Sequence, residues 1–542
     1  MSSGSRFWWR NAVIYQVYPR SFADADGDGT GDLAGVRSRL PYLAALGVDA
    51  LWFTPWYRSP QNDGGYDVAD YRAIDPVLGT LEEAEALIAE ALELGIRTIV
   101  DIVPNHVSSE HEWFAEALAA APGDPARERF WFRSGRGESG ELPPTEWTSS
   151  FSGPAWTRLE DGQWYLHLFA PEQPDLNWSH PDVVAEHEAV LRFWYDRGVA
   201  GVRIDSASML VKDPELPEID AAHGPGGHPH NDREEVHDIY RSWRKIADSY
   251  DEPRVLVGEV WLPDADRFAR YLRADEMHMA FNFDFMTRPW APEPLRESIE
   301  TTLEVHRAVD APPTWVLSNH DVTRPVTRYG REDSSFSFEA KRFGTPTDLG
   351  LGTRRARAAA LLTAALPGVL YIYQGDELGL PEVEDLPDEV REDPMHHRSG
   401  GTDPGRDGCR VPLPWTGTGR AFGFGGDPWL PQPEDWGRYA VETQMDDPDS
   451  TLSLYRKAIE LRRRWRGADF EWMPTDSQIL AFRRGEDLAC VVNFGDAPAD
   501  LPDHDEVLLA STRLEDGRLP GDAAAWLRTR PSHNSQARST NR

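Results

Sequence analysis

Short apolar stretches alternate with longer amphipathic stretches along most of this chain. Eight of the apolar stretches are rich in β-branched and aromatic residues, which favour strands. They are AVIYQVYP (12–19), ALWFTP (50–55), RTIVDIVP (97–104), GVRIDS (201–206), VLVGEV (255–260), MAFNFDF (279–285), TWVLSNHD (314–321) and GVLYIYQ (368–374). Amphipathic helical patterns lie between them, for instance at 81–95, 182–198 and 354–366. Strands that alternate with helices indicate a parallel sheet, and eight such units are what a (β/α)8 barrel needs.

This alternation is interrupted once and ends before the C-terminus. The gap after the third run is aromatic-rich and weakly periodic, so residues 104–178 are predicted to form an inserted subdomain after strand three. After a helix expected at 450–466, short alternating stretches predict an antiparallel β-domain at 468–528. The fold class is therefore α/β, with a catalytic (β/α)8 TIM barrel at 1–103 and 179–467 that carries both additions. The polar residues 529–542 are expected to be a disordered tail.

Charge and composition narrow the partners of the chain. It has 542 residues and a net charge of −35, which argues against nucleic acid and anionic membranes as partners and is compatible with a neutral small molecule. Cys409 and Cys490 are far apart and lack metal-ligand spacing, so a reducing compartment fits. The sequence has no signal-peptide pattern and no apolar run of transmembrane length. A cytoplasmic monomer or homodimer is expected.

Polar residues collect where the predicted strands end. Barrel enzymes place their active sites at the carboxyl ends of the strands. The residues there are Asp101, Asn105, His106, Arg203, Asp205, Glu259, Asn319, His320, Asp321, Asp376 and Glu377. Three of the carboxylates, after strands four, five and seven, would face a single cavity.

Carboxylates without Lys, Cys or Ser partners suggest glycoside hydrolysis. In GVRIDSAS (201–208), Arg203 and Asp205 are two positions apart and share one face of the strand. The arginine would keep Asp205 ionised as a nucleophile, and Glu259 suits the proton donor. The alternative is that Arg203 and Asp205 form only a buried salt bridge in the barrel. The other strand-end carboxylates favour the catalytic interpretation.

Several short motifs, in this order, resemble glycoside hydrolase family 13, the α-amylase family. They are DIVPNH (101–106), QPDLNW (173–178), GVRID (201–205), GEVW (258–261) and LSNHD (317–321). The second is typical of the branch that holds oligo-1,6-glucosidases and α-glucosidases, and the resemblance covers about residues 7–530. It implies that Asp205 is the nucleophile and Glu259 the general acid/base. Asp321 would be the third carboxylate, which favours a distorted, oxocarbenium-like sugar ring.

The resemblance also implies a set of sugar-binding residues. Arg203 would orient Asp205, while His106 and His320 would hold the sugar in the −1 subsite. Asp63 would bind hydroxyls at the non-reducing end, and Tyr66 would stack under the ring. Arg406 would pair with Asp63 and block the far end of the pocket. The inserted subdomain would contribute Phe151, Phe169 and Gln173, with core packing as the alternative for the two phenylalanines.

The loop DADGDGTGDL (24–33) has the spacing of an EF-hand at Asp24, Asp26 and Asp28. Its twelfth position is Gly35 instead of Glu, and it follows a strand. It resembles instead a cation loop after strand one of the same branch, with ligands from Asp24, Asp26, Asp28, Asp32 and the Thr30 carbonyl. Oxygen ligands imply structural Ca²⁺ or Mg²⁺, with an unoccupied polar turn as the alternative. No cofactor is expected for catalysis.

Two departures from the family pattern bear on the substrate. Ser208 and Met209 stand where many α-amylases have a Lys-His pair, which argues against endo action. Ser206 follows the nucleophile, where a Val in this branch goes with α-1,6 links, so α-1,4 links are favoured. We therefore predict a retaining exo-α-glucosidase that releases glucose from the non-reducing ends of short, maltose-type α-glucosides.

Three alternatives remain open. Transglucosylation, sucrose hydrolysis and disaccharide isomerisation share all of these motifs, because a sugar hydroxyl can intercept the glucosyl-enzyme. An oligo-1,6-glucosidase also shares them. A non-catalytic barrel protein associated with a transporter is more distant, since it needs a transmembrane segment and usually lacks the catalytic carboxylates.

Overall fold

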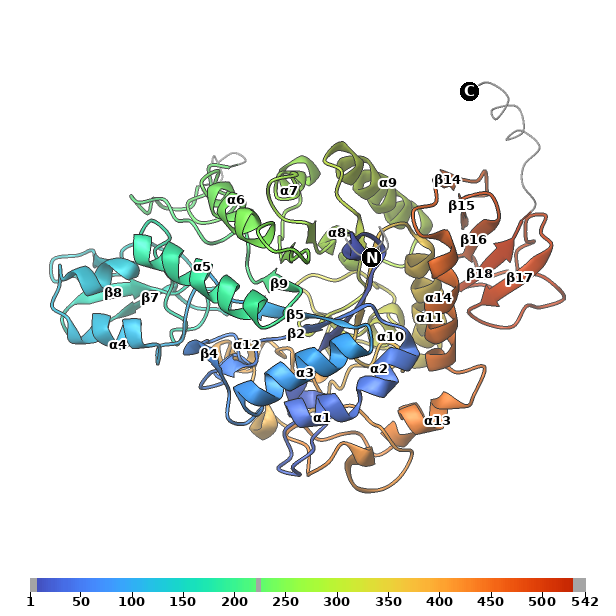
Figure 1. Ribbon diagram of the computed structural model, residues 1–542, viewed down its shortest axis with the longest axis horizontal. Coiled ribbons are helices and arrows are strands. Elements are labelled where there is room, and N and C mark those ends of the chain that lie inside the picture. The colour runs from blue at the N-terminus through green and yellow to red at the C-terminus, as the bar shows by residue number, and fades with distance from the viewer. Residues whose placement is uncertain (1–6, 221–225, 530–542) are drawn as a thin grey trace.

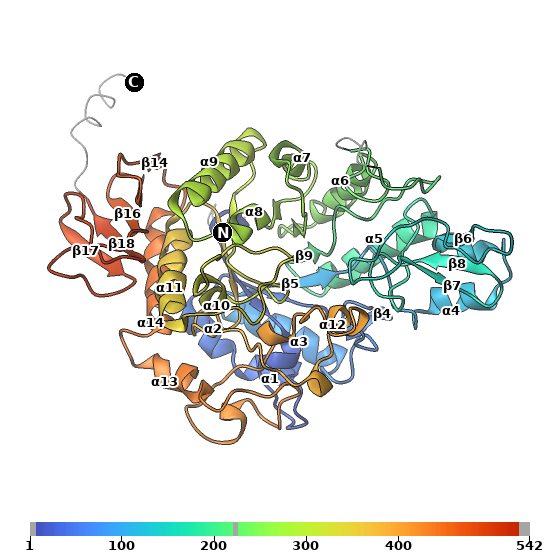
Figure 2. The same ribbon diagram turned by 180° about the vertical axis from the view of Figure 1, so that it is seen from behind.

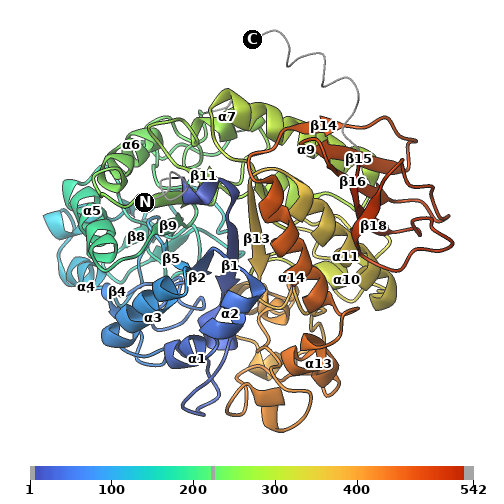
Figure 3. The same cartoon turned by 45° about the vertical axis from the view of Figure 1, so that its right-hand side comes forward.

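Eight parallel strands form the centre of the molecule in the computed structural model, which describes residues 7–220 and 226–529 (Figures 1 and 3). Their order is β11-β10-β9-β5-β2-β1-β13-β12. They are β1 (Val13–Val17), β2 (Ala50–Phe53), β5 (Arg97–Ile102), β9 (Gly201–Ile204), β10 (Val255–Gly258), β11 (Met279–Ala280), β12 (Thr314–Trp315) and β13 (Val369–Tyr373). The hydroxyl of Thr314 donates to the carbonyl of Ala280 at 2.6 Å and joins the two edges. The predicted (β/α)8 barrel is confirmed.

Alternation along each strand explains why these runs are apolar throughout. Val255 and Val257 pack in the barrel interior with Ile99 and Trp52, whereas Leu256 packs in the outer layer between strands and helices. Both faces of every strand are therefore buried, as expected for a parallel sheet covered by helices.

Helices surround the strands in Figure 3. They are α1 (Leu33–Ser38), α2 (Leu40–Leu46), α3 (Leu81–Glu93), α4 (Glu112–Ala119), α5 (Pro181–Asp196), α6 (Val236–Ala247), α7 (Ala265–Arg270), α8 (Phe283–Thr287), α9 (Pro292–Ala308), α10 (Pro325–Tyr329), α11 (Leu349–Ala365), α12 (Pro394–Arg398), α13 (Val441–Met445) and α14 (Thr451–Arg462). Local signals set some of the boundaries. A capping box between Thr80 and Glu83 starts α3, for example.

Two strands are shorter than their apolar runs predict. The run 279–285 leaves the sheet after β11, because Asn282 accepts the Phe285 N–H at 3.0 Å and starts α8. The run 314–321 leaves it after β12, so Asn319, His320 and Asp321 lie in the loop that follows. That loop carries them to the carboxyl end of the barrel.

A separate small sheet follows β5 and extends away from the barrel, at the left of Figure 1 and the right of Figure 2. It consists of β6 (Phe132–Ser134), β8 (Gln163–Leu166) and β7 (Trp156–Arg158), in that order. These strands lie within the predicted insertion 104–178. A two-stranded ribbon of β3 (Tyr57–Arg58) and β4 (Asp70–Ile74) follows β2 on the same side.

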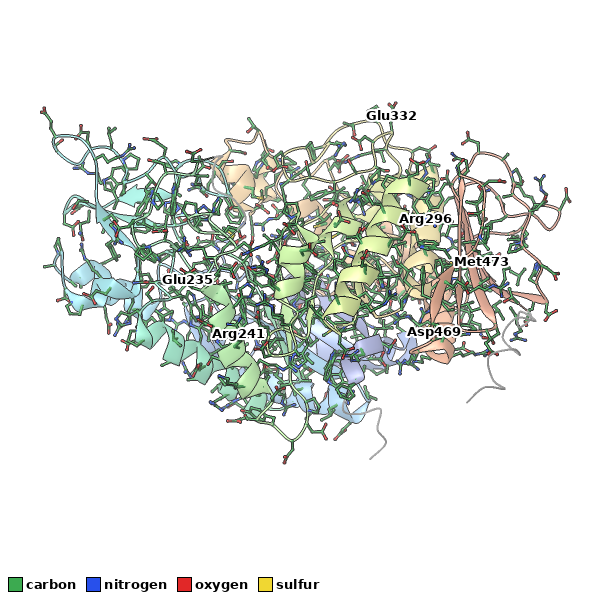
Figure 4. All side chains as sticks on the ribbon, turned by 90° about the horizontal axis from the view of Figure 1, so that it is seen from above. Glu235, Arg241, Arg296, Glu332, Asp469 and Met473 are labelled. Atoms are coloured by element: carbon green, nitrogen blue, oxygen red, sulfur yellow. The ribbon has the colours of Figure 1, made fainter. Side chains whose placement is uncertain are left out.

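An antiparallel sheet forms the C-terminal part, as expected. Its order is β14 (Phe470–Trp472), β15 (Ile479–Arg484), β16 (Leu488–Asn493), β18 (Ala523–Arg528) and β17 (Glu506–Ala510). It packs on α11, where the indole N–H of Trp526 donates to the Leu361 carbonyl at 3.1 Å. Arg296 on α9 lies beside this sheet, with its guanidinium 4.7 Å from the ring centre of Trp472. Asp469 and Met473, labelled with Arg296 in Figure 4, stand directly before and after β14.

The predicted tail 529–542 lies outside the described residues except for Thr529. Within the described ranges, none of the helices combines the length and the apolar character needed to cross a lipid bilayer.

Candidate active site

A cavity of about 470 Å³ opens where the barrel strands end and meets the inserted region. Ten of the twelve residues predicted to be catalytic or sugar-binding line it. They are Asp63, Tyr66, His106, Phe151, Phe169, Asp205, Glu259, His320, Asp321 and Arg406. The other two, Arg203 and Gln173, are buried behind its wall at 1% and 0% exposure. The structure thus brings together residues from segments spread over more than 300 positions.

Arg203 holds three carboxyl groups together beneath the cavity. It lies on β9 between β5 and β10, in register with Asp101 and Val257. Its guanidinium contacts Asp101 at 2.9 Å, Asp205 at 2.8 Å and Glu259 at 2.7 Å. Asp205 follows β9 and Glu259 follows β10, so the ends of adjacent strands bring both carboxyls to one guanidinium. Arg203 and Asp205 are two positions apart, so their side chains lie on the same face and contact each other, as strand geometry predicts.

Three carboxyl groups share one positive charge here, which disfavours the ionisation of all three at neutral pH. Burial raises the pKa of Asp101 to about 7, although its hydrogen-bonded contact with Arg203 opposes the rise. Burial and then the neighbouring Glu259 carboxyl raise the pKa of Asp205 well above its ordinary value. The group as a whole therefore holds at least one proton near neutrality, as a site that needs both an acid and a carboxylate requires.

Ser206 contacts both of the proposed catalytic carboxyls. Its N–H donates to Glu259 Oε2 at 2.9 Å, and its hydroxyl donates to Asp205 Oδ2 at 3.0 Å. Its φ of 45° lies in the left-handed region, where a β-branched residue is strained. Ser206 therefore aligns the two carboxyls. The sequence predicted an influence of Ser206 on linkage preference, but it did not predict these two contacts.

Asp321 is held by a pair of arginines. Its Oδ1 accepts from Arg406 at 3.1 Å and from Arg410 at 3.0 Å. Burial would raise the pKa of Asp321, but the positive charges of the Arg406 and Arg410 guanidinium groups oppose this. The pKa of this carboxyl therefore lies below its ordinary value, and it stays ionised.

Asp63 and Arg406 close one side of the cavity. Arg406 Nη2 donates to Asp63 Oδ1 at 2.6 Å, although the two residues are 343 positions apart. Gln173 was predicted to line the site but lies behind it, where its amide donates to Asp63 Oδ2 at 3.0 Å. Its own carbonyl accepts the Ala170 N–H at 3.0 Å, which fixes the amide in this orientation. Gln173 therefore contacts the cavity through two lining residues, Asp63 and His106, whose ring Nε2 lies 3.1 Å from the same amide nitrogen.

The two histidines of the cavity are neutral. Burial lowers the pKa of His106 to about 4, and it lowers the pKa of His320 well below its ordinary value. The Tyr66 ring lies parallel to His320, with ring centres 5.2 Å apart and planes 5° apart, and its hydroxyl donates to Asp101 at 2.9 Å. Neutral rings at this position can exchange hydrogen bonds with sugar hydroxyls without adding charge.

The phenylalanines of the inserted region face the cavity and also pack against one another. The ring centres of Phe151 and Phe169 are 5.3 Å apart, and the guanidinium of Arg406 lies 4.9 Å from the centre of Phe151. Phe151 and Phe169 therefore line the cavity and also pack against each other, so the two interpretations are compatible.

Several lining residues were not predicted from the sequence. They are Ser150, Asn231, Trp261, Phe338, Glu339 and Met395. Arg410 and Asp393 were missed as well, although Asp393 accepts from the Arg406 Nε. Some signal was present, since Trp261 belongs to the GEVW motif and Arg410 to the segment that carries Arg406. The others come from irregular loops, or in the case of Met395 from the short helix α12, and no periodic pattern marks them.

The carboxylates of Asp24, Asp26 and Asp28 lie together in the loop after β1, with oxygens within 4.8 Å of one another. Asp24 accepts three backbone N–H groups, from Gly27, Gly29 and Gly426. An all-oxygen donor set of this kind fits a hard divalent cation.

The two other predicted ligands have different contacts. Asp32 is not part of this group: its oxygens accept from the backbone of Ala25, Asp26 and Gly35 and cap α1. The Thr30 N–H donates to Asp28 at 2.7 Å.

Comparison with known proteins gives two family matches. A model described as the alpha amylase catalytic domain matches residues 16–467. A second, described as a domain of unknown function (DUF3459), matches residues 458–526, which hold the C-terminal sheet.

Similar curated proteins span nearly the whole chain. A probable alpha-glucosidase of Rhizobium meliloti (strain 1021) is 37% identical, over 91% of this chain and 90% of that protein. A trehalose-6-phosphate hydrolase of Escherichia coli (strain K12) is 36% identical over 90% of each. An oligo-1,6-glucosidase of Parageobacillus thermoglucosidasius is 33% identical, over 92% of this chain and 93% of its own length.

Solved structures have the same architecture. An alpha-glucosyl transfer enzyme is 33% identical with a TM-score of 0.83, over 96% of this chain and 99% of the other. The trehalulose synthase from Pseudomonas mesoacidophila MX-45 is 29% identical with a TM-score of 0.83, over 96% and 99%.

Proposed function

This chain belongs to the α-amylase family of glycoside hydrolases, and from that premise we propose that it is a retaining, exo-acting α-glucosidase. It releases glucose from the non-reducing ends of short α-glucosides, with α-1,4 links preferred. The observation that carries the proposal is the Arg203 group: one guanidinium contacts Asp205 and Glu259, and the group keeps a proton near neutrality.

The first chemical step forms a glucosyl-enzyme. Asp205 attacks the anomeric carbon while Glu259 gives its proton to the glycosidic oxygen, so the C–O bond breaks and the aglycone leaves as an alcohol. Arg203 and the Ser206 hydroxyl hold the Asp205 carboxylate in line for this attack. Glu259 then takes a proton from water, which attacks the same carbon and releases glucose with its α-configuration retained.

The ionised Asp321 carboxylate stabilises the transition state. It stands in the cavity wall between Arg406 and the carboxyl pair, with its charge maintained by two guanidinium groups. Bonds from this carboxylate to sugar hydroxyls strengthen as the ring flattens and positive charge develops, so they accelerate the reaction more than they tighten substrate binding.

Exo action follows from the closed side of the cavity. In this proposal the ion pair between Asp63 and Arg406 blocks a further sugar beyond the −1 subsite. Asp63 and Arg406 are 4% and 8% exposed, and both groups also have other partners, so the pair does not open easily. A glucose at the chain end fits against this wall, and an internal glucose does not.

The charge of the cavity favours a neutral aglycone. Among the described residues that line it, Arg406 is the only arginine or lysine, and three carboxylates already bind it: Asp63, Asp321 and Asp393. The exposed Glu339 adds negative charge to the lining. Relatives named trehalose-6-phosphate hydrolase are similar to this chain. A bound phosphate group needs a cation, however, and the arginine of this cavity is already paired with carboxylates.

Transfer of glucose to another sugar is the second candidate. Solved neighbours include an alpha-glucosyl transfer enzyme and a trehalulose synthase, and their chemistry differs from hydrolysis only in what intercepts the glucosyl-enzyme. The cavity lining also includes Phe338 and Asn231, an aromatic and a polar side chain that can hold a second sugar as the acceptor.

A structural divalent cation at Asp24, Asp26 and Asp28 is part of the proposal. Three carboxylates so close together repel one another, and a bound Ca²⁺ or Mg²⁺ would remove that repulsion and fix the loop against the Gly426 segment. The ion supplies no step of the reaction.

The proposed compartment rests on the two cysteines, and the proposed class of partner rests on the net charge. Cys409 and Cys490 are free and buried, which suits a reducing, cytoplasmic compartment. The net charge of −35 suits a small neutral substrate instead of nucleic acid or an anionic membrane. We propose a monomer or homodimer.

Product analysis tests the function. Initial rates on maltose, isomaltose, sucrose and trehalose 6-phosphate are measured, and the anomeric form of the released glucose is followed by proton NMR. We expect α-glucose to appear first, maltose to be the best substrate and trehalose 6-phosphate the poorest. Release of β-glucose, or a preference for the phosphorylated sugar, would overturn the proposal. Disaccharide products without net hydrolysis would establish transfer instead.

A further inference from the structure

We propose that Trp261 is the positioning residue of the acid/base: its indole N–H holds Glu259 Oε1 so that the proton of that oxygen faces the glycosidic oxygen. The inference rests on the proposed function and adds a specific role for a loop residue. Its basis is the set of contacts around Glu259 and the aromatic stack behind Trp261.

The two oxygens of Glu259 have unequal environments. Oε2 accepts the Ser206 N–H at 2.9 Å and lies 2.7 Å from Arg203 Nη2. Among the residues that the structure describes, Oε1 accepts only the indole N–H of Trp261, at 3.0 Å. Because two strong donors already occupy Oε2, the proton of the acid belongs on Oε1.

An oxygen that carries a proton keeps one hydrogen-bond position for a donor. Trp261 fills that position, so the O–H of Glu259 is turned away from the indole. Glu259 and Trp261 both line the cavity, and the free direction is therefore toward the substrate. Without the indole N–H the carboxyl could rotate and lose this alignment.

The indole is itself fixed by stacking. It lies parallel to Phe283 of α8, with ring centres 3.6 Å apart and planes 7° apart. The Phe338 ring meets it edge-on at 5.2 Å. Phe338 belongs to the loop between α10 and α11, so two distant segments hold Trp261 in one orientation. Such stacked pairs favour a defined geometry beyond the area they bury.

The same bond serves both halves of the reaction. In the first half the Oε1 proton moves to the glycosidic oxygen as that C–O bond breaks, and Glu259 becomes a carboxylate. The indole N–H then stabilises the new charge on Oε1. In the second half this oxygen takes a proton from the attacking water, which restores the acid.

A leaving-group comparison tests the role. Trp261→Phe keeps an aromatic ring on Phe283 but removes the N–H. Maltose needs a proton on its departing sugar, whereas α-glucosyl fluoride departs with little help from an acid. General acid catalysis supplies about 10²–10⁴-fold, so losing its alignment should lower kcat/KM on maltose by about 10- to 100-fold. On α-glucosyl fluoride we expect a change of less than about twofold, since little of that acid catalysis is used.

A second variant gives a further readout. Phe283→Leu, which leaves the indole but removes its stacking partner, should show a smaller loss on maltose and again spare the fluoride.

Trp290→Phe is the matched control. The Trp290 indole N–H also donates to a carboxylate, Asp522 at 2.7 Å, and packs on Phe494 with ring centres 4.5 Å apart. It lies between the barrel and the C-terminal sheet, so its loss should leave the ratio of the two substrates unchanged.

Equal losses on maltose and fluoride in Trp261→Phe, or no loss on either, would refute the positioning role. If the wild-type enzyme hydrolysed neither substrate, the proposed function itself would fall, and this result is distinct from the first.

Discussion

Replacing Arg203 by methionine removes the one positive charge that Asp101, Asp205 and Glu259 share. The side chain of Arg203 is 1% exposed, so water cannot take its place easily. The three carboxyls then remain together in a buried site with no cation. Breaking a buried pair in this way costs about 3–5 kcal/mol, a large part of the roughly 5–15 kcal/mol that stabilises a folded protein.

The loss depends on pH, and its sign follows from the direction of the pKa shifts. Burial already raises the pKa of Asp101 to about 7, and it raises the pKa of Asp205 as well. Without the guanidinium both values rise further, so the folded variant binds more protons than the unfolded chain. Stability that depends on such groups is present below the ordinary carboxyl pKa and is lost as pH rises through the folded value.

The size of this loss in the free energy of unfolding can be worked out at two pH values. Holding one additional proton costs about 1.4 kcal/mol for each pH unit above the ordinary carboxyl pKa of about 4. At pH 5 the additional cost in Arg203→Met is therefore about 1.5 kcal/mol, and at pH 8 it reaches the full 3–5 kcal/mol or so of a broken buried pair. Glucosidase activity at pH 8 falls at least about a hundredfold, or about 2.7 kcal/mol in the barrier, because Asp205 is protonated.

Urea unfolding of the wild type and the variant at pH 5 and pH 8 measures this difference. Asp101→Asn combined with Arg203→Met removes one of the uncompensated carboxyls and should recover part of the stability at pH 8, but no activity. A loss in Arg203→Met that is the same at both pH values, or larger at pH 5, would show that the carboxyls do not share protons through Arg203.

Three further changes test other parts of the site. Arg406→Leu leaves Asp63 without its cation and opens the closed side, so chromatography of maltotetraose digests should show maltose beside glucose; glucose alone at an unchanged KM would contradict exo action through this pair. Ser206→Ala removes the 3.0 Å bond to Asp205 and should lower kcat by about tenfold, with the ratio of maltose to isomaltose rates as the readout of linkage. In the wild type a chelator should lower the midpoint of thermal unfolding without changing the initial rate at low temperature. The Asp26→Asn variant should already have the lower midpoint, and the chelator should not lower it further. A chelator effect that persists in Asp26→Asn would exclude that carboxylate as a ligand.

The barrel was predictable because its pattern is local. Strands buried on both faces read as continuous apolar runs, and eight of them between amphipathic helices leave few other architectures. Strand ends were harder to locate. The run 279–285 looks like one strand, but Asn282 caps a helix inside it, and only tertiary packing decides between the two.

The site was predictable where a short motif carries the geometry. Arg203 and Asp205 share a strand face by spacing alone, and the carboxyl ends of adjacent strands bring in Glu259. Contacts between loops far apart in sequence were not predictable in this way. Arg410 reaches Asp321 across 89 positions, and Trp261 is held by Phe338 from another loop. No periodicity encodes such pairings, so they required the folded structure.

The most direct test of the account is to trap the glucosyl-enzyme. The protein is incubated with 5-fluoro-α-glucosyl fluoride, digested, and the labelled peptide is sequenced by mass spectrometry. We expect one label per chain on Asp205, lost on incubation with an acceptor sugar as activity returns. A label on Glu259 or Asp321, or full turnover of the reagent by an Asp205→Asn variant, would contradict it.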